Sequence, residues 1–213
     1  MSLITLTDPS SPVSEAYRTL RTNLMSFGVD EALRTLVVSS AETNDDKSKT
    51  AANLAVTMAQ GGNRTLLVDA DMRRPALHDL FGISNGKGLS ELILEGGSAS
   101  VSSTNVENLS VLTAGSKPLN PADLLGSKRS GEIIDSFKEE YDIVVFDAPP
   151  VIPVTDAVVL GSKVDGVLLV VQAGKSRRDH AEKAKAILDQ AKVRILGATL
   201  TNAPKDDSVE SYY

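Results

Sequence analysis

Four short apolar runs constrain the fold of this chain more than any other feature of its 213 residues. Each run is rich in Val, Leu and Ile, and segments with helical spacing of apolar residues separate the runs. Continuous apolar runs are typical of strands buried on both faces of a parallel sheet, and the intervening helices supply the crossovers. The pattern predicts an α/β fold with a doubly wound, mostly parallel sheet and helices on both faces. The core strands are expected at residues 35–38, 66–69, 143–147 and 167–171.

The other segments are consistent with one domain over residues 1–213. Residues 1–12 are polar with two prolines and are expected to form an extended N-terminal arm, followed by a helix over 13–27. Residues 204–213 are expected to form a flexible tail that carries two tyrosines. Further helices are predicted from residue 48 and over 76–81, 89–94, 121–125, 130–141, 155–163 and 177–192, with further strands at 109–113 and 195–200.

Composition excludes several classes of site. The net charge is -6, which argues against a surface built to bind nucleic acid. There is no cysteine, so disulfides, thiolate catalysis and cysteine-ligated metals are excluded. No apolar run approaches the roughly 20 residues that a membrane-spanning helix needs, and residues 1–11 lack a signal-peptide pattern. His78 and His180 lack ligand spacing and are expected to be surface or capping residues.

The segment from Thr35 to Leu54 has the order strand, loop, helix, with Lys47 and Ser48 at the start of the helix. Phosphate-binding loops have this order: backbone N–H groups and a lysine hold phosphate oxygens, and the hydroxyl ligates magnesium. The glycines of that motif are absent, because Ala41 and Asp46 occupy their positions. Taken alone, the loop favours an ordinary connection between strand and helix.

Carboxylates at the ends of two other strands favour a phosphate-binding loop over an ordinary connection. Asp69 and Asp71 end one apolar strand, and Asp147 ends another. Open α/β sheets bind ligands at the carboxyl ends of their strands, so these side chains and the Lys47 loop are expected to converge. The combination predicts a magnesium-nucleotide site. Arg73, with Arg74 beside it, could neutralise phosphate or an acidic substrate, although arginines in loops are usually solvated.

The helix predicted over residues 13–27 carries Glu15, Arg18 and Arg21 at three-residue steps. One interpretation is a solvated face with a Glu15–Arg18 pair worth a few tenths of a kcal/mol. The other is a docking surface for another subunit. Spacing alone favours the solvated face.

Several motifs in this order resemble the bacterial tyrosine kinases that regulate capsular and exopolysaccharide synthesis. The resemblance covers nearly the whole chain and includes the terminal tyrosines. Its motifs are EAYRTLRTNL at 15–24, KSKTAANLA at 47–55, LLVDADMRRP at 66–75, LTAGSKPLNPADLL at 112–125 and IVVFDAPPV at 143–151. The resemblance implies a P-loop NTPase fold and a protein-tyrosine kinase that uses ATP and Mg²⁺.

The resemblance also implies roles for individual residues. Lys47 matches the lysine that contacts the phosphates, and Ser48 the hydroxyl that ligates magnesium. Asp69 and Asp71 match acids implicated in binding magnesium and in accepting the tyrosine proton, and Asp147 matches a further magnesium-site acid. The nucleotide contacts are expected from Thr43, Asn44, Asp45, Asp46, Lys47, Ser48 and Lys49, with Asn202 near adenine. Catalysis is assigned to Lys47, Asp69, Asp71 and Arg73, and magnesium binding to Ser48, Asp71 and Asp147.

The same resemblance implies assembly and partners. Glu15, Arg18 and Arg21 match a motif through which family members associate into rings. Tyr212 and Tyr213 match tyrosines that one subunit phosphorylates on the tail of the next. A membrane protein of the polysaccharide co-polymerase type is expected to activate the kinase, and a cognate tyrosine phosphatase to reverse it. The chain is then expected to be cytoplasmic, held at the inner face of the membrane by that partner.

Two alternatives remain open. A partitioning-type ATPase would share the fold, but its loop needs a second lysine near the start, which Ala41 to Thr43 do not offer. A non-catalytic scaffold is favoured by Asp45 and Asp46, since acids beside the phosphates weaken ATP binding, but such a scaffold would not need the three strand-end aspartates.

Overall fold

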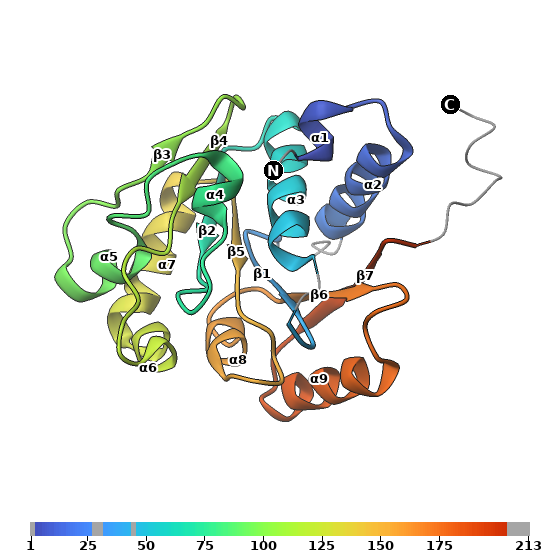
Figure 1. The fold of residues 1–213 in the computed structure, drawn as a ribbon. Helices are drawn as coiled ribbons and strands as arrows, with labels where there is room; N and C mark the ends of the chain where they lie inside the picture. Colours follow the sequence, from blue (N-terminus) through green and yellow to red (C-terminus); the bar gives the residue numbers. More distant parts are fainter. Residues whose placement is uncertain (1–2, 27–31, 44–45, 204–213) are drawn as a thin grey trace.

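The computed structural model describes residues 3–26, 32–43 and 46–203 (Figure 1). Within them, seven strands form one sheet in the order β3-β4-β2-β5-β1-β6-β7, and every neighbouring pair is parallel except β3 with β4. The strands are β1 Thr35–Ser40, β2 Thr65–Asp69, β3 Ser102–Ser103, β4 Leu109–Leu112, β5 Ile143–Asp147, β6 Val167–Gln172 and β7 Ile195–Thr201. The predicted fold class is confirmed, and all four predicted core strands lie in this sheet.

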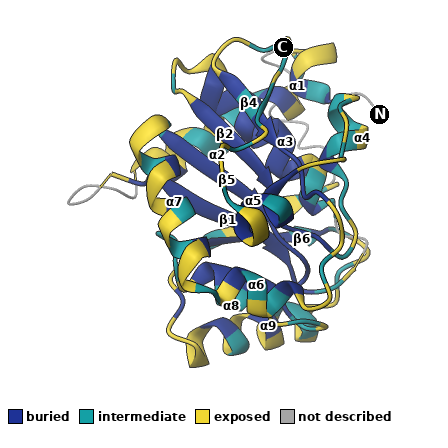
Figure 2. Ribbon diagram, turned by 90° about the vertical axis from the view of Figure 1, so that its left-hand side faces the viewer, coloured by how far each residue is buried: buried dark blue, intermediate teal, exposed yellow. Residues whose placement is uncertain are grey.

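Helices cover both faces of the sheet, as Figures 1 and 2 show. Their bounds are α1 Ile4–Thr7, α2 Pro12–Ser26, α3 Lys47–Gln60, α4 Leu77–Phe81, α5 Leu89–Glu95, α6 Pro121–Gly126, α7 Lys128–Glu140, α8 Asp156–Gly161 and α9 Arg178–Gln190. Strand side chains alternate between two hydrophobic layers. Leu36 and Val38 pack in the layer that contains α3, whereas Val37 packs in the layer that contains α7, α8 and α9.

The chain changes direction across the sheet beside β1. From β1 it runs through β2 and β4 toward one edge, returns through β5, and then continues through β6 and β7 to the other edge. The carboxyl ends of β1, β5 and β2 are therefore adjacent, with Asp147 paired in register with both Val38 and Asp69. A reversal of this kind is where open α/β sheets bind ligands.

The extended arm predicted for residues 1–12 is wrong in part. Residues Ile4–Thr7 form the helix α1, and α2 already begins at Pro12. The backbone N–H and the hydroxyl of Thr5 both donate to the Asn53 side-chain oxygen, at 3.1 and 2.8 Å. The polar composition and the two prolines suggested an exposed arm, but Leu3 and Thr5 are buried. Their burial depends on packing against α3, which the local sequence does not show.

Two other connections contain local structure. Within the segment 98–108, Ser102–Ser103 pairs with β4 as a short antiparallel strand. After Asp147, residues 151–153 form a turn, and Val151 donates its N–H to the Ser40 carbonyl at 2.8 Å. The tail predicted over 204–213, with Tyr212 and Tyr213, lies outside the described residues.

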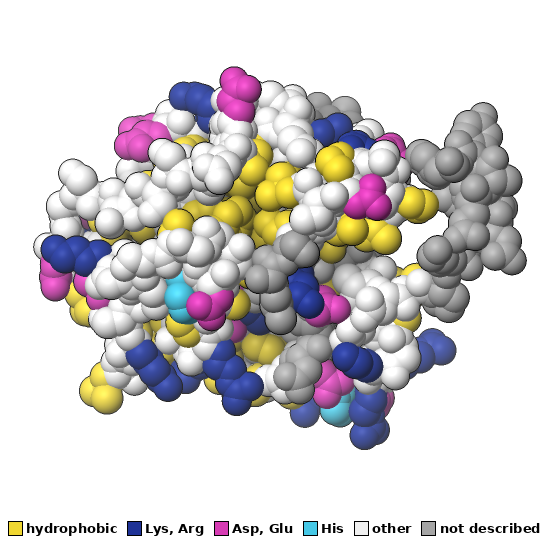
Figure 3. Space-filling model, turned by 45° about the horizontal axis from the view of Figure 1, so that its top comes forward, with side chains coloured by type: hydrophobic (Ala, Val, Ile, Leu, Met, Phe, Trp, Pro, Cys, Tyr) yellow, Lys and Arg dark blue, Asp and Glu magenta, His cyan; other side chains and the backbone are white. Residues whose placement is uncertain are grey.

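Surface charge and helix length bear on partners. On the face in Figure 3, basic and acidic side chains are interspersed, so no single-sign patch dominates that face. In the described part of the chain, no helix combines the length and apolar character needed to cross a bilayer.

Candidate functional site

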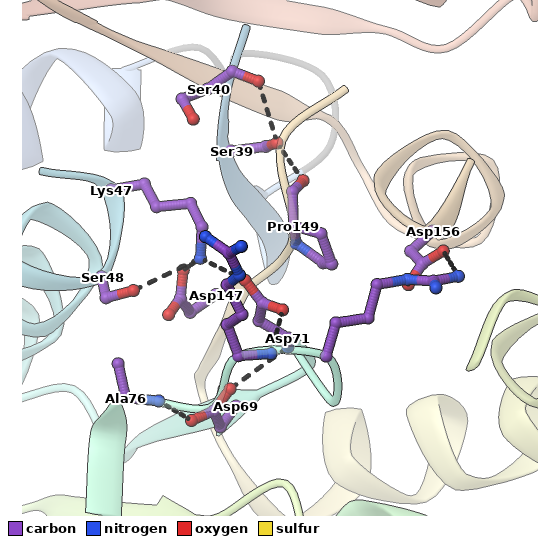
Figure 4. Close-up of polar contacts among 12 residues, drawn as sticks. Ser39, Ser40, Lys47, Ser48, Asp69, Asp71, Ala76, Asp147, Pro149 and Asp156 are labelled. Carbon is purple, nitrogen blue, oxygen red and sulfur yellow. Dashed lines mark hydrogen bonds and ion pairs between the residues drawn. The ribbon is translucent and has the colours of Figure 1, made fainter. Parts of the chain in front are cut away.

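A lysine held between two aspartates forms the centre of the candidate site (Figure 4). Lys47 is the first residue of α3, and its Nζ lies 2.9 Å from both Asp71 Oδ2 and Asp147 Oδ1. Burial by itself would lower the pKa of Lys47, but the charges of Asp147 and Asp71 outweigh it, so the pKa lies above its usual value. The ammonium group therefore stays charged and holds two strand ends together.

Asp147 supplies a buried carboxylate oxygen without a hydrogen-bond partner in the described part of the chain. Its side chain is fully buried at the end of β5, and Oδ2 has no hydrogen-bond partner among the described residues. Burial raises the pKa of Asp147, while the charge of Lys47 opposes that rise. A buried acceptor without a partner is costly and points to a missing donor or cation.

The two aspartates that follow β2 have different environments. Asp69 accepts hydrogen bonds from the backbone N–H groups of Ala76, at 2.9 Å, and Leu77, at 3.0 Å, and a third from Asp71 at 3.1 Å. Burial, with a further contribution from Asp147, raises the pKa of Asp69 to about 7. Asp71 instead directs one oxygen at Lys47 and accepts the Arg74 N–H with the other, at 3.0 Å. Asp69 therefore shapes the loop, and Asp71 faces the lysine.

Arg73 is paired with Asp156, an acid that belongs to none of the sequence motifs. Its Nε and Nη2 donate to the two carboxylate oxygens of Asp156 at 2.8 and 2.9 Å. Asp156 is fully buried at the start of α8, so the arginine neutralises a buried charge. The predicted phosphate-neutralising role of Arg73 remains a prediction, since the guanidinium is bound elsewhere in this state. An aspartate in the first turn of a predicted helix offers no signal for such a pair.

The loop between β1 and α3 is tied to β6 and α9 through its acids. Asp46, immediately before α3, accepts a hydrogen bond from Gln172 Nε2 at 3.0 Å and pairs with Lys49 at 3.5 Å. Glu42 Oε2 lies 2.9 Å from His180 Nδ1. Thr43 is exposed, and the predicted contacts Asn44 and Asp45 lie outside the described residues.

The oxygen donors fit magnesium rather than a softer metal. The hydroxyl of Ser48 and the carboxylates of Asp71 and Asp147 meet around Lys47, and Mg²⁺ prefers oxygen ligands. No group of three or more His, Cys, Asp or Glu ligands occurs in the described ranges. Mg²⁺ does not need one, because it is usually held by one or two carboxylates together with water and substrate phosphates.

The remaining predicted residues lie apart from Lys47. Asn202 is exposed after β7, and β6 separates that strand from β1. On α2 the predicted Glu15–Arg18 ion pair is confirmed, at 2.6 Å. Arg18 also donates to the Pro9 carbonyl at 2.5 Å, and Arg21 to the Thr57 carbonyl at 2.8 Å. Both arginines therefore have partners within the chain, and their role between subunits stays a prediction.

Comparisons with known proteins agree on one family. A family model described as an AAA domain matches residues 34–178. Tyrosine-protein kinase YwqD of Bacillus subtilis is 42% identical over 201 residues, which cover 93% of this chain and 85% of the relative. The crystal structure of the chimerical protein CapA2B2 matches with a TM-score of 0.91 and 38% identity, over 95% of this chain and 90% of that one. The kinase domain of the Escherichia coli tyrosine kinase ETK matches with a TM-score of 0.91 and 31% identity, over 98% and 82% of the two chains.

Proposed function

This chain belongs to the bacterial tyrosine-protein kinases, which have a P-loop NTPase fold, and we propose that it transfers the γ-phosphoryl group of Mg-ATP to tyrosine. One observation carries the proposal: Lys47 lies between the carboxylates of Asp71 and Asp147 at the first turn of α3. A cation, oxygen ligands and a helix N-terminus thus meet at the carboxyl ends of the central strands. Phosphoryl transfer needs these groups, since its catalysis is mostly positioning and charge neutralisation.

Each residue of the cluster has a distinct role in this proposal. Lys47 leaves the two carboxylates and binds phosphate oxygens, together with backbone N–H groups at the start of α3. That exchange releases Asp71 and Asp147, which with Ser48 would hold Mg²⁺. The metal, when bound, supplies positive charge against the phosphates.

The transfer step needs a base for the tyrosine hydroxyl. The phenolic oxygen forms a bond to the γ-phosphorus, the bond to the β–γ bridging oxygen breaks, ADP leaves, and the phenolic proton passes to a carboxylate. Asp71 is the better base, because Asp69 already accepts three backbone N–H groups. The predicted catalytic role of Asp69 becomes one of positioning.

The proposed acceptors are Tyr212 and Tyr213 of a neighbouring subunit, brought to the site by ring-like association through α2. We also place the kinase in capsular or exopolysaccharide biosynthesis, consistent with the family resemblance. A co-polymerase membrane protein would hold it at the inner face of the membrane, and a tyrosine phosphatase would reverse the modification. Both partners are part of the proposal.

Incubating the purified chain with Mg-ATP tests the proposal. Phosphotyrosine is measured by mass spectrometry, ADP release by a coupled assay, and Mg-ADP binding by calorimetry. We expect phosphotyrosine, its loss in Lys47→Met and Asp71→Asn, and its retention in Lys185→Met. Lys185 is a suitable control because it pairs with Asp189 on the exposed side of α9.

The alternatives are outcomes of the same experiment. ADP without phosphotyrosine would indicate the ATPase switch. Absence of both products, together with absence of Mg-ADP binding, would indicate a scaffold and overturn the proposal.

A further inference from the structure

Asp46 occupies the position at which a phosphate-binding loop has the glycine next to its lysine. Its carboxylate accepts a hydrogen bond from Gln172, the last residue of β6. We propose that Gln172 is a positioning residue for this loop. Its amide draws the Asp46 carboxylate away from the first turn of α3 and keeps the N–H groups there open to phosphate. The inference rests on the proposed nucleotide function and deepens it.

Without Gln172, the carboxylate has an obvious alternative partner. Asp46 is the N-cap residue of α3, and its carbonyl accepts the Thr50 N–H at 2.8 Å. Aspartate is among the most favoured N-cap residues because its side chain accepts the N–H of the second or third helical residue, here Ser48 or Lys49. Those are groups that a bound phosphate needs. A capping Asp46 would therefore compete directly with nucleotide.

In the structure the Asp46 carboxylate does not cap α3 but is hydrogen-bonded to Gln172. No hydrogen bond joins the Asp46 side chain to the start of α3. One oxygen accepts from Gln172 Nε2 at 3.0 Å, and the other lies 3.5 Å from Lys49 Nζ. The lysine is 46% exposed, and exposed pairs contribute little, so Gln172 is the stronger restraint.

Gln172 is rigid enough to act in this way. It is 2% exposed at the end of β6, pairs in register with Thr201, and donates its backbone N–H to Ser176 Oγ at 2.7 Å. Its amide oxygen, in contrast, is buried with no hydrogen-bond partner in the described ranges. A buried amide that leaves its oxygen unsatisfied is a poor stabiliser of a core. The hydrogen bond to Asp46 gives the nitrogen of this buried amide a partner.

The acid on the other side of residues 43–45 is held in a similar way. Glu42 Oε2 lies 2.9 Å from His180 Nδ1, and Glu42 accepts the Arg177 backbone N–H at 3.4 Å. Both acids are thus bound by the β6–α9 side of the molecule. The contacts of Asp46 with Gln172 and of Glu42 with Arg177 both hold a carboxylate of the loop toward β6 and α9. Both therefore support displacement of negative charge from the phosphate site.

The substitution Gln172→Met removes the amide donor Nε2 and keeps the length of the side chain. We expect Mg-ADP affinity, measured by calorimetry, to weaken about tenfold as Asp46 turns to cap α3. The melting temperature should not fall, because an unsatisfied amide oxygen is removed and a helix cap is gained. In an Asp46→Gly background the same replacement should change affinity less than about twofold. Gln190→Met, at the exposed end of α9, is the matched control.

Amide hydrogen exchange without nucleotide provides a separate readout. Exchange at Ser48 and Lys49 should slow in Gln172→Met and not in the Asp46→Gly, Gln172→Met double variant. Unchanged affinity and exchange would overturn the inference, as would a loss of affinity that persists without Asp46. If the unaltered chain fails to bind Mg-ADP while exchange slows as expected, the proposed function fails and the displacement of Asp46 by Gln172 stands.

Discussion

Asp46 still carries a negative charge beside Lys47, although Gln172 and Lys49 bind its carboxylate. At about 5 Å and an effective dielectric near 20, one like-charge contact with phosphate costs on the order of 3 kcal/mol, roughly a hundredfold in affinity. The Lys49 pair offsets part of this cost. A side chain at position 46 also crowds the backbone that must approach phosphate, which a nearby lysine cannot correct.

We therefore expect weak Mg-ATP binding by the unaltered chain, and tighter binding by the Asn44→Gly, Asp46→Gly variant, by at least about tenfold. Calorimetry of both proteins measures the difference. Comparable affinities would mean that the loop binds phosphate by a different geometry.

The Arg73–Asp156 ion pair is predicted to contribute to the stability of the fold. Asp156 is fully buried, and Arg73 alone is seen to pair with it among the described residues. Arg73→Leu should lower the free energy of unfolding by about 3 kcal/mol, because it leaves a buried carboxylate unpaired. The Arg73→Leu, Asp156→Leu variant should recover most of that loss. Urea denaturation measures the free energy of unfolding of both variants. An equal loss of stability in the single and the double variant would show that the unpaired Asp156 carboxylate is not the cause.

The element α5 is fastened to the loop after β4 by one carboxylate. Glu91 accepts the N–H groups of Gly88, at 2.8 Å, and Ser116, at 3.0 Å, and also the Ser116 hydroxyl. Burial would raise the pKa of Glu91, but these hydrogen bonds outweigh it and lower the pKa to about 2. A pKa below the usual 4.5 stabilises the fold at pH values above 4.5, and the effect is lost as pH falls from 4.5 toward 2.

Glu91 is only partly buried, so solvent screens its charge and limits the effect. Glu91→Gln should accordingly cost about 1–2 kcal/mol in the free energy of unfolding at pH 7 and clearly less at pH 3. Chemical denaturation at both pH values measures this. Glu139→Gln, at an exposed position of α7, is the control. A cost that does not change with pH would mean that the carboxylate charge is not involved.

At the scale of the whole molecule, α2 is the element proposed to join subunits. Its arginines have intramolecular partners, so docking must use the same charges in a second contact or exchange one partner for another. Arg18→Ala with Arg21→Ala should then lower the mass of the assembly and the phosphorylation of Tyr212 and Tyr213. Light scattering and mass spectrometry measure the two effects.

Lys128→Ala is the control for that experiment, because Lys128 is 92% exposed on α7. An unchanged monomer in every variant would leave Glu15–Arg18 as a local ion pair only. The melting temperature must also be followed, since Arg21 contacts the last turn of α3 through Thr57.

Local pattern was sufficient to predict the strands other than β3, most helices, and the location of Lys47, Asp71 and Asp147 at one edge of the sheet. Apolar runs predict buried strands because a sheet covered on both faces requires apolar side chains at every position. Asp71 and Asp147 follow such runs, and Lys47 opens a helix after another, so a parallel sheet places all three at the same edge. They meet because β2, β5 and β1 are adjacent in the sheet.

Only the tertiary structure decided which partner each polar group has. Asp69 and Asp71 are two residues apart and look alike in sequence, yet one binds backbone N–H groups and the other binds Lys47. Arg73 meets Asp156 across 83 positions, and Gln172 meets Asp46 across 126. Helical or strand periodicity extends over a few residues, whereas these contacts depend on how β2, β5, β1 and β6 are ordered and on what each packs against.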